Sequence, residues 1–166
     1  AAGTLALECD TGSGRVTVET TTPLRLRNWY EVSGGCDPAA GKLWLAERSL
    51  MKGSLARPGH RAERAVDGAA KLGNATVLIA AAGDPEKPRD HYNGKLEAPR
   101  IESVDAKGRA NLVAAWDFSR GMTSTRVEDA GPNGLHGEVV NLPVRAMTGS
   151  NWTGAVMDWK EAPEQY

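Results

Sequence analysis

Two stretches in the second half of the chain decide its fold. They are DHYNGKLEAPRI, residues Asp90 to Ile101, and LVAAWDFSRGMTSTRVEDAGPNGLHGEVVN, residues Leu112 to Asn141. In the second stretch, LVAAWDF and LHGEVVN are typical of strands, and GPNG between them is typical of a turn. In the first stretch, Asn93 and Gly94 form the kind of pair that adopts positive φ in a tight turn. A polar link, DAKGRAN, lies between the two stretches. We therefore expect this half of the chain to consist of short strands.

The first half of the chain predicts two hairpins. In TLALECDTGSGRVTVET, Val16 and Val18 alternate with polar residues after the turn TGSG, which is the pattern of a strand with one wet face. PLRLRNWYEVSGGCDPAAGKLWLAE predicts a longer hairpin. It has an alternating segment from Leu24, a strand that opens at Trp29, the turn DPAAG, and a last strand around Leu43.

The middle of the chain is less regular. The segment MKGSLARPGHRAERAVDGAAKLG, residues 51–73, predicts a loop with at most one helical turn at residues 62–65, because proline and glycine interrupt anything longer. ATVLIAAAG, residues 75–83, predicts a buried strand that is apolar on both faces. The charged segment GDPEKPRD then predicts a loop before His91.

Composition sets the fold class and excludes some partners. A chain of 166 residues suits one domain, and about nine or ten short strands with almost no helix favour an all-β, two-layer sandwich. The 20 Lys and Arg residues nearly cancel the 21 Asp and Glu residues. No broad positive field exists, so we expect neither nucleic acid nor a membrane surface as a partner. No apolar run approaches the roughly 20 residues of a membrane-spanning helix.

The N-terminal residues and the cysteines bear on the cellular compartment of the protein. AAGTLALECD has no basic leader followed by an apolar stretch, so we expect a cytoplasmic protein. Cys9 and Cys36 could pair if their strands are neighbours. Two cysteines without an export signal are more often free thiols, which is the state we expect.

The quoted motifs resemble those of laminin G-like, concanavalin-like domains. The Trp-Tyr-x-Val strand at Trp29 resembles the middle of such a domain, HYNGKLEAPRI its end, and AAWDFS with EDAGPNGLHGEVVN its beginning. The resemblance implies a jelly-roll β-sandwich in circularly permuted strand order over residues 1–166. Such a rotation is physically allowed, since the first and last strands of the sandwich lie side by side and ESVDAKGRAN can join them.

A denser resemblance covers residues 114–166. This run is similar to the large (β) subunit of the N,N-dimethylformamidase family, with GPNGLHG, NLP, NWTG, MDW and APEQY as its specific points. The resemblance implies that residues 142–166 are an extended tail leading toward a catalytic part. It implies that Trp152, Trp159 and Tyr166 are interface candidates, and that the partners are the remainder of the large subunit and a small subunit. In that family a mononuclear iron is held by two Tyr and one Glu in the catalytic part. No Tyr of this chain matches that motif, and we expect no cofactor here.

Candidate catalytic and metal-binding residues are few. His136, between glycines, is more often a hydrogen-bonded structural residue than a ligand, and His60 and His91 are expected to be solvated. The pair Glu128 and Asp129 and the group Asp84, Glu86 and Asp90 could serve calcium binding or glycoside hydrolysis, although solvated surface is the more common role. No nucleophile elbow, phosphate-binding loop, Cys-x-x-Cys or His-Glu-x-x-His occurs. No complete catalytic set is therefore present, and enzymatic activity of the chain stays an open question.

Three functions follow from these observations. The first is a non-catalytic β-sandwich domain from the large subunit of an amide hydrolase, packed against the catalytic part or against other subunits. The second is a carbohydrate-binding module with calcium-dependent loops. The third, a stand-alone hydrolase, has no residues that single it out.

Overall fold

The computed structural model describes residues 3–11, 14–53, 57–67, 76–105, 107–141 and 145. In these residues the chain forms eleven strands, every strand pair is antiparallel, and no α-helix occurs. The prediction of an all-β protein is therefore confirmed. The chain divides into two compact units, Ala1–Val77 and Leu78–Tyr166, called unit 1 and unit 2 below. The prediction of one permuted jelly roll over residues 1–166 stays a prediction.

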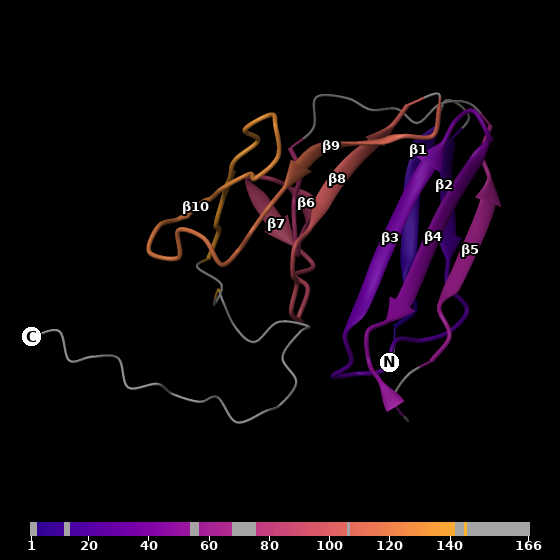
Figure 1. The fold of residues 1–166 in the computed structure, drawn as a ribbon, viewed down its shortest axis with the longest axis horizontal. Helices are drawn as coiled ribbons and strands as arrows, with labels where there is room; N and C mark the ends of the chain where they lie inside the picture. The colour runs from indigo at the N-terminus through magenta and orange to yellow at the C-terminus, as the bar shows by residue number, and fades with distance from the viewer. Residues whose placement is uncertain are drawn as a thin grey trace, which may run out of the picture. The chain divides into compact units, whose positions relative to one another are not determined.

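Unit 1 is built of two sheets. The first pairs β1 (Ala6–Thr11) with β2 (Gly14–Glu19), and the second has the order β3 (Tyr30–Asp37), β4 (Lys42–Ser49), β5 (His60–Ala65). In Figure 1, β1 lies behind β3 and β4, so that the two sheets face each other as layers. Both hairpins that the alternation predicted, β1–β2 and β3–β4, are confirmed.

The core of unit 1 lies between its two layers. It consists of Val18, Leu43, Leu45 and Val66, which are at most 8% exposed. Leu43 and Leu45 are alternate residues of the central strand β4, so they point to the same face. The strand expected near Leu24 does not form, and Leu26 is 85% exposed.

Strand β5 corrects the sequence prediction of a loop with a helical turn. HRAERA pairs residue by residue with β4, from Lys42 opposite Ala65 to Glu47 opposite His60. Apart from alanine the strand carries no apolar residue, so its sequence gave no alternation signal. The ladder along β4 supplies its hydrogen bonds, and Ala62 packs against the core.

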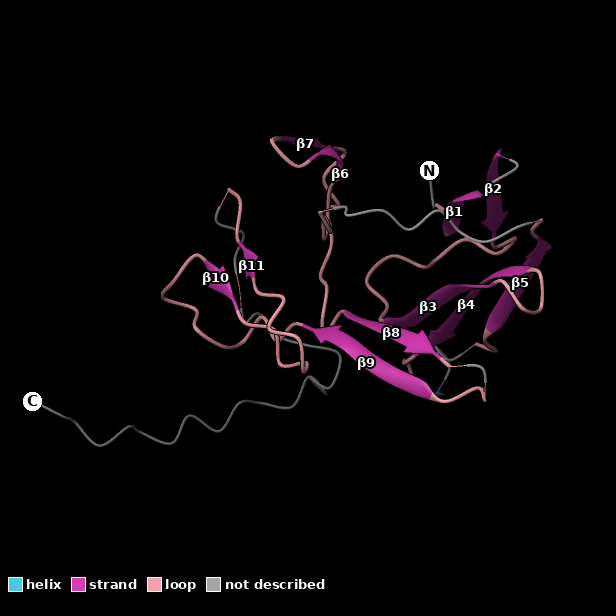
Figure 2. Cartoon of the chain, turned by 90° about the horizontal axis from the view of Figure 1, so that it is seen from above, coloured by secondary structure: helices cyan, strands magenta, loops and turns pink. Residues whose placement is uncertain are grey.

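Unit 2 contains three two-stranded ribbons (Figure 2). They are β6 (Ala82–Asp84) with β7 (Lys87–Arg89), β8 (Arg100–Val104) with β9 (Ala110–Ala115), and β10 (Arg126–Val127) with β11 (Gly137–Glu138). Its core comprises the buried residues Ala114, Trp116 and Val127, with Phe118 and Val139 packed against them. A bridge from Trp116 to Asp129 connects the end of β9 to the segment after β10.

Two further predictions in this region are wrong. In the segment 75–83, Val77 is 55% and Ile79 is 36% exposed, and of its described residues, 76–83, the last two belong to a strand, β6. Asn93 and Gly94 do not adopt positive φ. A Cβ on Gly94 would meet the ring of Tyr92, which is 56% exposed and can turn away, so the structure does not require glycine at this position.

The pairing of β8 with β9 bears on strand order. Arg100 lies opposite Ala115 and Val104 opposite Ala110, with a bulge between Ile101 and Glu102. The sequence placed residues 102–111 in a link, and the structure makes the two ends of that link, residues 102–104 and 110–111, into parts of paired strands. Among the residues that the structure describes, none lies in a helix that could cross a bilayer.

Candidate functional site

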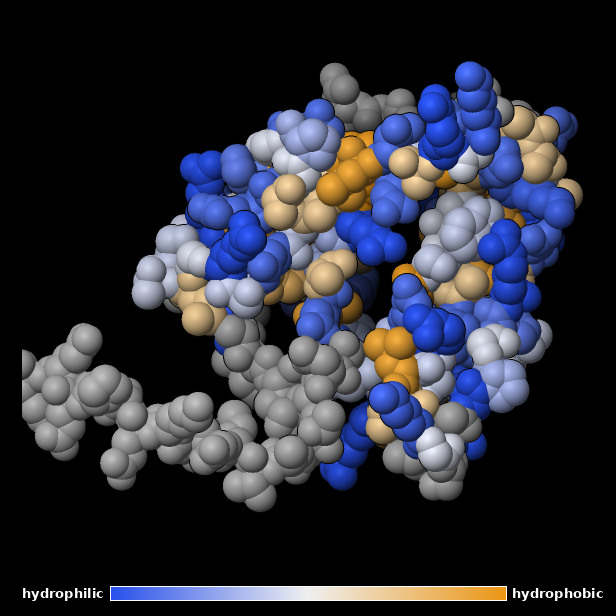
Figure 3. Space-filling model, in the orientation of Figure 1, coloured by the Kyte–Doolittle hydropathy of each residue, from blue (hydrophilic) through white to orange (hydrophobic). Residues whose placement is uncertain are grey.

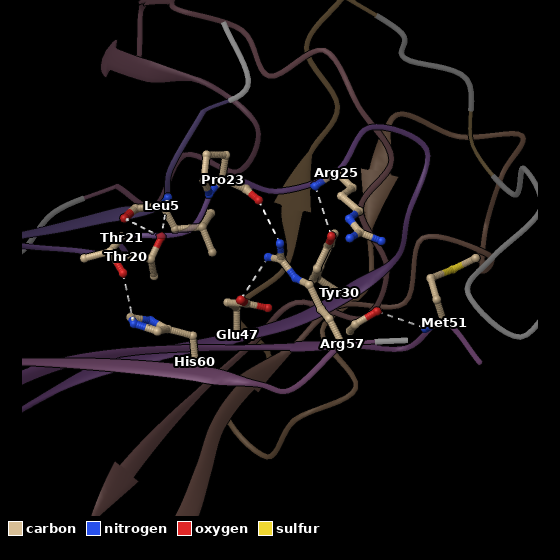
Figure 4. A network of polar contacts seen from close by, with 11 residues as sticks. Leu5, Thr20, Thr21, Pro23, Arg25, Tyr30, Glu47, Met51, Arg57 and His60 are labelled. Carbon is tan, nitrogen blue, oxygen red and sulfur yellow. Dashed lines mark hydrogen bonds and ion pairs between the residues drawn. The ribbon is translucent and has the colours of Figure 1, made fainter. Parts of the chain in front are cut away.

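A buried ion pair in unit 1 is the first candidate centre (Figure 4). Arg57 Nη2 lies 3.0 Å from Glu47 Oε1, and the two side chains are 12% and 1% exposed. Arg57 Nη1 also donates a hydrogen bond to the carbonyl oxygen of Pro23 at 2.9 Å. The guanidinium lies 5.0 Å from the centroid of the Tyr30 ring. Arg57 therefore ties strand β4 to the segment that precedes β3.

The polar atoms around this pair are not all satisfied. Within the described part of the chain, the buried atoms without a hydrogen-bond partner are Asn28 Nδ2, Glu47 Oε2, Arg57 Nε and His60 Nδ1. The other ring nitrogen of His60 lies 3.3 Å from Thr21 Oγ1. Buried polar groups are usually paired, so this cluster could accept a further polar group. A carboxylate already held by a guanidinium is better suited to fixing loops than to transferring protons.

Asp129 is the second candidate centre, in unit 2. Its Oδ1 accepts hydrogen bonds from the N–H groups of Ala115 at 2.8 Å and Gly131 at 2.7 Å, and its Oδ2 accepts one from the N–H of Leu135 at 2.8 Å. The N–H of Asp129 donates to Nδ1 of His136 at 3.1 Å. The backbone N–H of Ala115 is the main cause that lowers the pKa of the Asp129 carboxyl. A carboxylate that accepts three hydrogen bonds from backbone N–H groups holds the loop around it in place.

The rest of the motif GPNGLHG serves the same loop. The indole Nε1 of Trp116 donates to the carbonyl oxygen of Leu135 at 2.8 Å, and Asn133 Nδ2 donates to that of Val113 at 2.8 Å. A Cβ on Gly131 would lie 2.8 Å from Asp129 Oδ1, so the loop needs glycine there. The motif that carries the resemblance to laminin G-like domains thus closes a turn onto β9. The structural, hydrogen-bonded role expected of His136 agrees with this arrangement.

The acidic groups considered for calcium do not converge. Asp84 and Glu86 belong to the β6–β7 hairpin, where the N–H of Glu86 donates to Asp84 Oδ1 at 2.9 Å. Asp129 is buried in its loop and Glu128 is exposed beside it. Across the described ranges, no three His, Cys, Asp or Glu side chains form a group that could hold a metal ion.

The remaining predicted site residues have varied positions. His91 is exposed, as predicted, whereas His60 is half-buried at the start of β5. Trp44 is half-buried on β4, and the Arg61 guanidinium lies 4.3 Å from its ring centroid. The interface candidates Trp152, Trp159 and Tyr166, with nearly all of the predicted tail 142–166, lie outside the described residues.

Sequence reasoning missed a surface on the β8–β9 ribbon. Val104 and Leu112, on one face, are 68% and 39% exposed, and Ile101, on the other face, is 38% exposed. Hydrophobic surface, in orange, is visible among the hydrophilic residues in Figure 3. A lone two-stranded ribbon is marginally stable in water, so such a ribbon usually needs a covering layer. Part of the signal was available in the sequence, because Val104 lies in ESVDAKGRAN, which was assigned to a link.

Unit 1 also carries a groove between the edge strands β2 and β5. Its lining residues include Arg15, Thr17, Arg64 and Asp67. A second hollow continues along the same two strands past Val18 and Ala62. The lining carries charges of both signs, so the groove favours no single class of charged ligand.

No family model matches the chain. The β subunit of N,N-dimethylformamidase from an Alcaligenes species is 30% identical over 188 aligned positions, which take in 93% of this chain and 25% of that protein. The corresponding subunit from Paracoccus aminophilus is 27% identical over 176 positions, taking in 87% of this chain and 23% of that protein. The chain thus spans about a quarter of the length of these curated relatives. Over most of its residues it is homologous to the β subunit of N,N-dimethylformamidase.

Proposed function

We propose that this chain is a non-catalytic β-domain from the large subunit of an amide hydrolase related to N,N-dimethylformamidase. The observation that carries the proposal is the homology, which takes in most of this chain but only a quarter of each relative. The catalytic part, with its mononuclear iron, then belongs to the other three quarters. The permuted jelly roll over residues 1–166 and attachment through Trp152, Trp159 and Tyr166 belong to the same proposal.

The chemistry of the described residues supports a structural role. The Asp129 carboxylate is saturated by backbone N–H groups, and the Glu47 carboxylate is paired with Arg57. The contacts that hold these two carboxylates are backbone N–H groups and a guanidinium, which fix a carboxylate in place and do not serve as its proton-transfer partners in hydrolysis. Both instead join segments that are distant in sequence.

The β8–β9 ribbon supports attachment to another part of the protein. Glu102 pairs with Leu112, and Val104 with Ala110, so Val104 and Leu112 lie on one face of the ribbon. Ser103, paired with Asn111, lies on the opposite face. We propose that the face with Val104 and Leu112 packs against the remainder of the large subunit or against a small subunit.

An activity assay tests the non-catalytic assignment. The chain is incubated with ferrous or ferric iron and N,N-dimethylformamide, and release of dimethylamine is measured. We expect no turnover above that of iron alone, because the iron-binding part is not in this chain. Turnover by the chain itself would contradict the proposal.

A binding assay tests the attachment face. The chain is co-produced as a separate polypeptide with the unmatched three quarters of the Alcaligenes relative, and co-purification is measured. We expect Val104→Glu to reduce co-purification, since it introduces a charge on the proposed interface, and Ser103→Glu on the opposite face to leave it unchanged. Equal effects of both variants would argue against this face. Chelator-sensitive binding on a glycan array would favour the carbohydrate-binding module instead.

A further inference from the structure

Cys9 and Cys36 lie in the two facing layers of unit 1. Cys9 belongs to β1 and Cys36 to β3, which are strands of different sheets. Both side chains are half-buried and pack against the same core of Val18, Leu43, Leu45 and Val66. The two thiols therefore project into the space between the layers.

The register of the layers brings the two cysteines together. A Cβ on Gly34 of β3 would lie 3.0 Å from Cδ2 of Leu7 on β1, so these two positions face each other. Each cysteine stands two residues further along its strand, at Cys9 and Cys36. Residues two apart on a strand point to the same face. The pKa of the Cys9 thiol is raised by burial first and then by interaction with the Cys36 thiol, which agrees with direct contact.

We propose that Cys9 and Cys36 form a reversible disulfide that joins β1 to β3 and so links the two layers of unit 1. A single disulfide between the sheets of a β-sandwich is a known arrangement, so the layer spacing allows one. In the reduced structure both thiols already pack against the same core. The inference rests on unit 1 alone and is independent of the proposed function.

The bond would form by exchange with a small disulfide such as oxidised glutathione. One protein thiolate attacks a sulfur of the oxidant, which forms a mixed disulfide and releases one glutathione thiolate. The second protein thiolate then attacks the protein sulfur of the mixed disulfide and releases the second glutathione. Two protein thiols are oxidised and one glutathione disulfide is reduced to two thiols. The two thiol protons pass to solvent or to the leaving thiolates.

The raised pKa of Cys9 affects the steps in which its own thiolate attacks. The thiolate is the attacking species, and a raised pKa leaves little thiolate near neutral pH. The rate at which the Cys9 thiolate attacks should therefore rise as the pH increases toward the pKa of Cys9. Once formed, the bond closes the loop that contains β2. It thereby lowers the conformational entropy of the unfolded chain, which favours the folded state.

The test uses the whole chain in mixtures of reduced and oxidised glutathione. Free thiols are alkylated, and the intact mass and a peptide map show whether Cys9 and Cys36 are joined. Urea unfolding then compares the two forms. We expect a cross-linked monomer at oxidising ratios, and a midpoint of unfolding at higher urea than for the reduced chain.

Two variants provide the control. Cys9→Ser and Cys36→Ser should each remove the cross-link and make the midpoint independent of the glutathione ratio. Because the reduced and oxidised wild-type chains are compared directly, the test does not depend on the stability of either variant. The proposal is overturned if both cysteines remain alkylated, if each carries its own glutathione, if only dimers form, or if oxidation leaves the midpoint unchanged.

Discussion

The two units stabilise their strands in different ways. Unit 1 stacks two sheets around buried aliphatic residues, with Leu43 at 1% exposure in its centre. In the residues of unit 2 that the structure describes, the strands pair in twos, and the core contains Ala114, Trp116 and Val127 and is closed by the Asp129 loop. The difference shows that layered sheets rely on apolar burial, whereas short ribbons need polar contacts that fix loops.

The largest effect should come from the apolar core of unit 1. Leu43→Ala removes a fully buried side chain and leaves a cavity, and we expect a loss of about 2–5 kcal/mol in the free energy of unfolding. Urea unfolding combined with hydrogen exchange on peptides of each unit measures the loss and locates it. Leu26→Ala is the control, because Leu26 is 85% exposed. A similar loss for both variants would contradict the assigned core.

The next effect concerns the charge within that core. Glu47→Gln keeps the side-chain shape but leaves the Arg57 guanidinium without its counter-ion, and we expect a loss of about 3 kcal/mol. The matched control is Glu31→Gln, which breaks the exposed ion pair with Arg48 on the same sheet and should cost less than about 1 kcal/mol. Urea unfolding of the two variants at one pH decides the comparison. If both lose the same stability, the burial of Arg57 has no energetic role.

A smaller effect is expected for the loop of unit 2. Trp116→Phe removes the indole N–H and leaves the carbonyl of Leu135 without its donor, which should cost about 1–3 kcal/mol. Hydrogen exchange should increase in the β9 and β10 peptides of unit 2 and remain unchanged in unit 1. Trp44→Phe in unit 1 is the control for the loss of an indole. If Trp116→Phe reduced protection against hydrogen exchange equally in both units, the indole of Trp116 would not act locally on its loop.

The smallest effect is a pH dependence confined to unit 2. The pKa of Asp129 is lowered in the folded state by the N–H of Ala115 and its neighbours, so its contribution to stability is complete above the unfolded value of about 3.9 and is lost as the pH falls through the folded value. Asp129→Asn should therefore be less stable than wild type at neutral pH. The difference in the free energy of unfolding between wild type and this variant should narrow below about pH 4. Urea unfolding curves of both proteins, recorded from neutral to acidic pH, measure this difference. A difference that does not change with pH would contradict the role of the carboxylate.

Part of the fold could be predicted from the sequence. The β1–β2 and β3–β4 hairpins were predicted correctly, because residues such as Val16, Val18 and Leu43 alternate with polar neighbours and the turns carry glycine or proline. Strand β5 was missed, because HRAERA has no apolar alternation and forms only along the ladder of β4. The segment 75–83 was predicted as buried from its composition, yet Val77 is exposed.

The candidate sites were less predictable than the strands. His136 was recognised as structural, but nothing in the spacing of EDAGPNGLHG shows that Asp129 accepts three backbone hydrogen bonds. Arg57 was placed in a loop without a partner, and its ion pair with Glu47 joins residues ten positions apart. Such pairs depend on how the chain returns on itself.

The sequence by itself determined the β class, the two N-terminal hairpins and the likeness to the dimethylformamidase β subunit, because these depend on local alternation, turn residues and motifs. Only the tertiary structure decided that β5 joins the sheet, that Asp129 clamps its loop, and that Cys9 faces Cys36. These features depend on contacts between distant residues. Their energies come from burial and hydrogen-bond geometry, which local patterns do not encode.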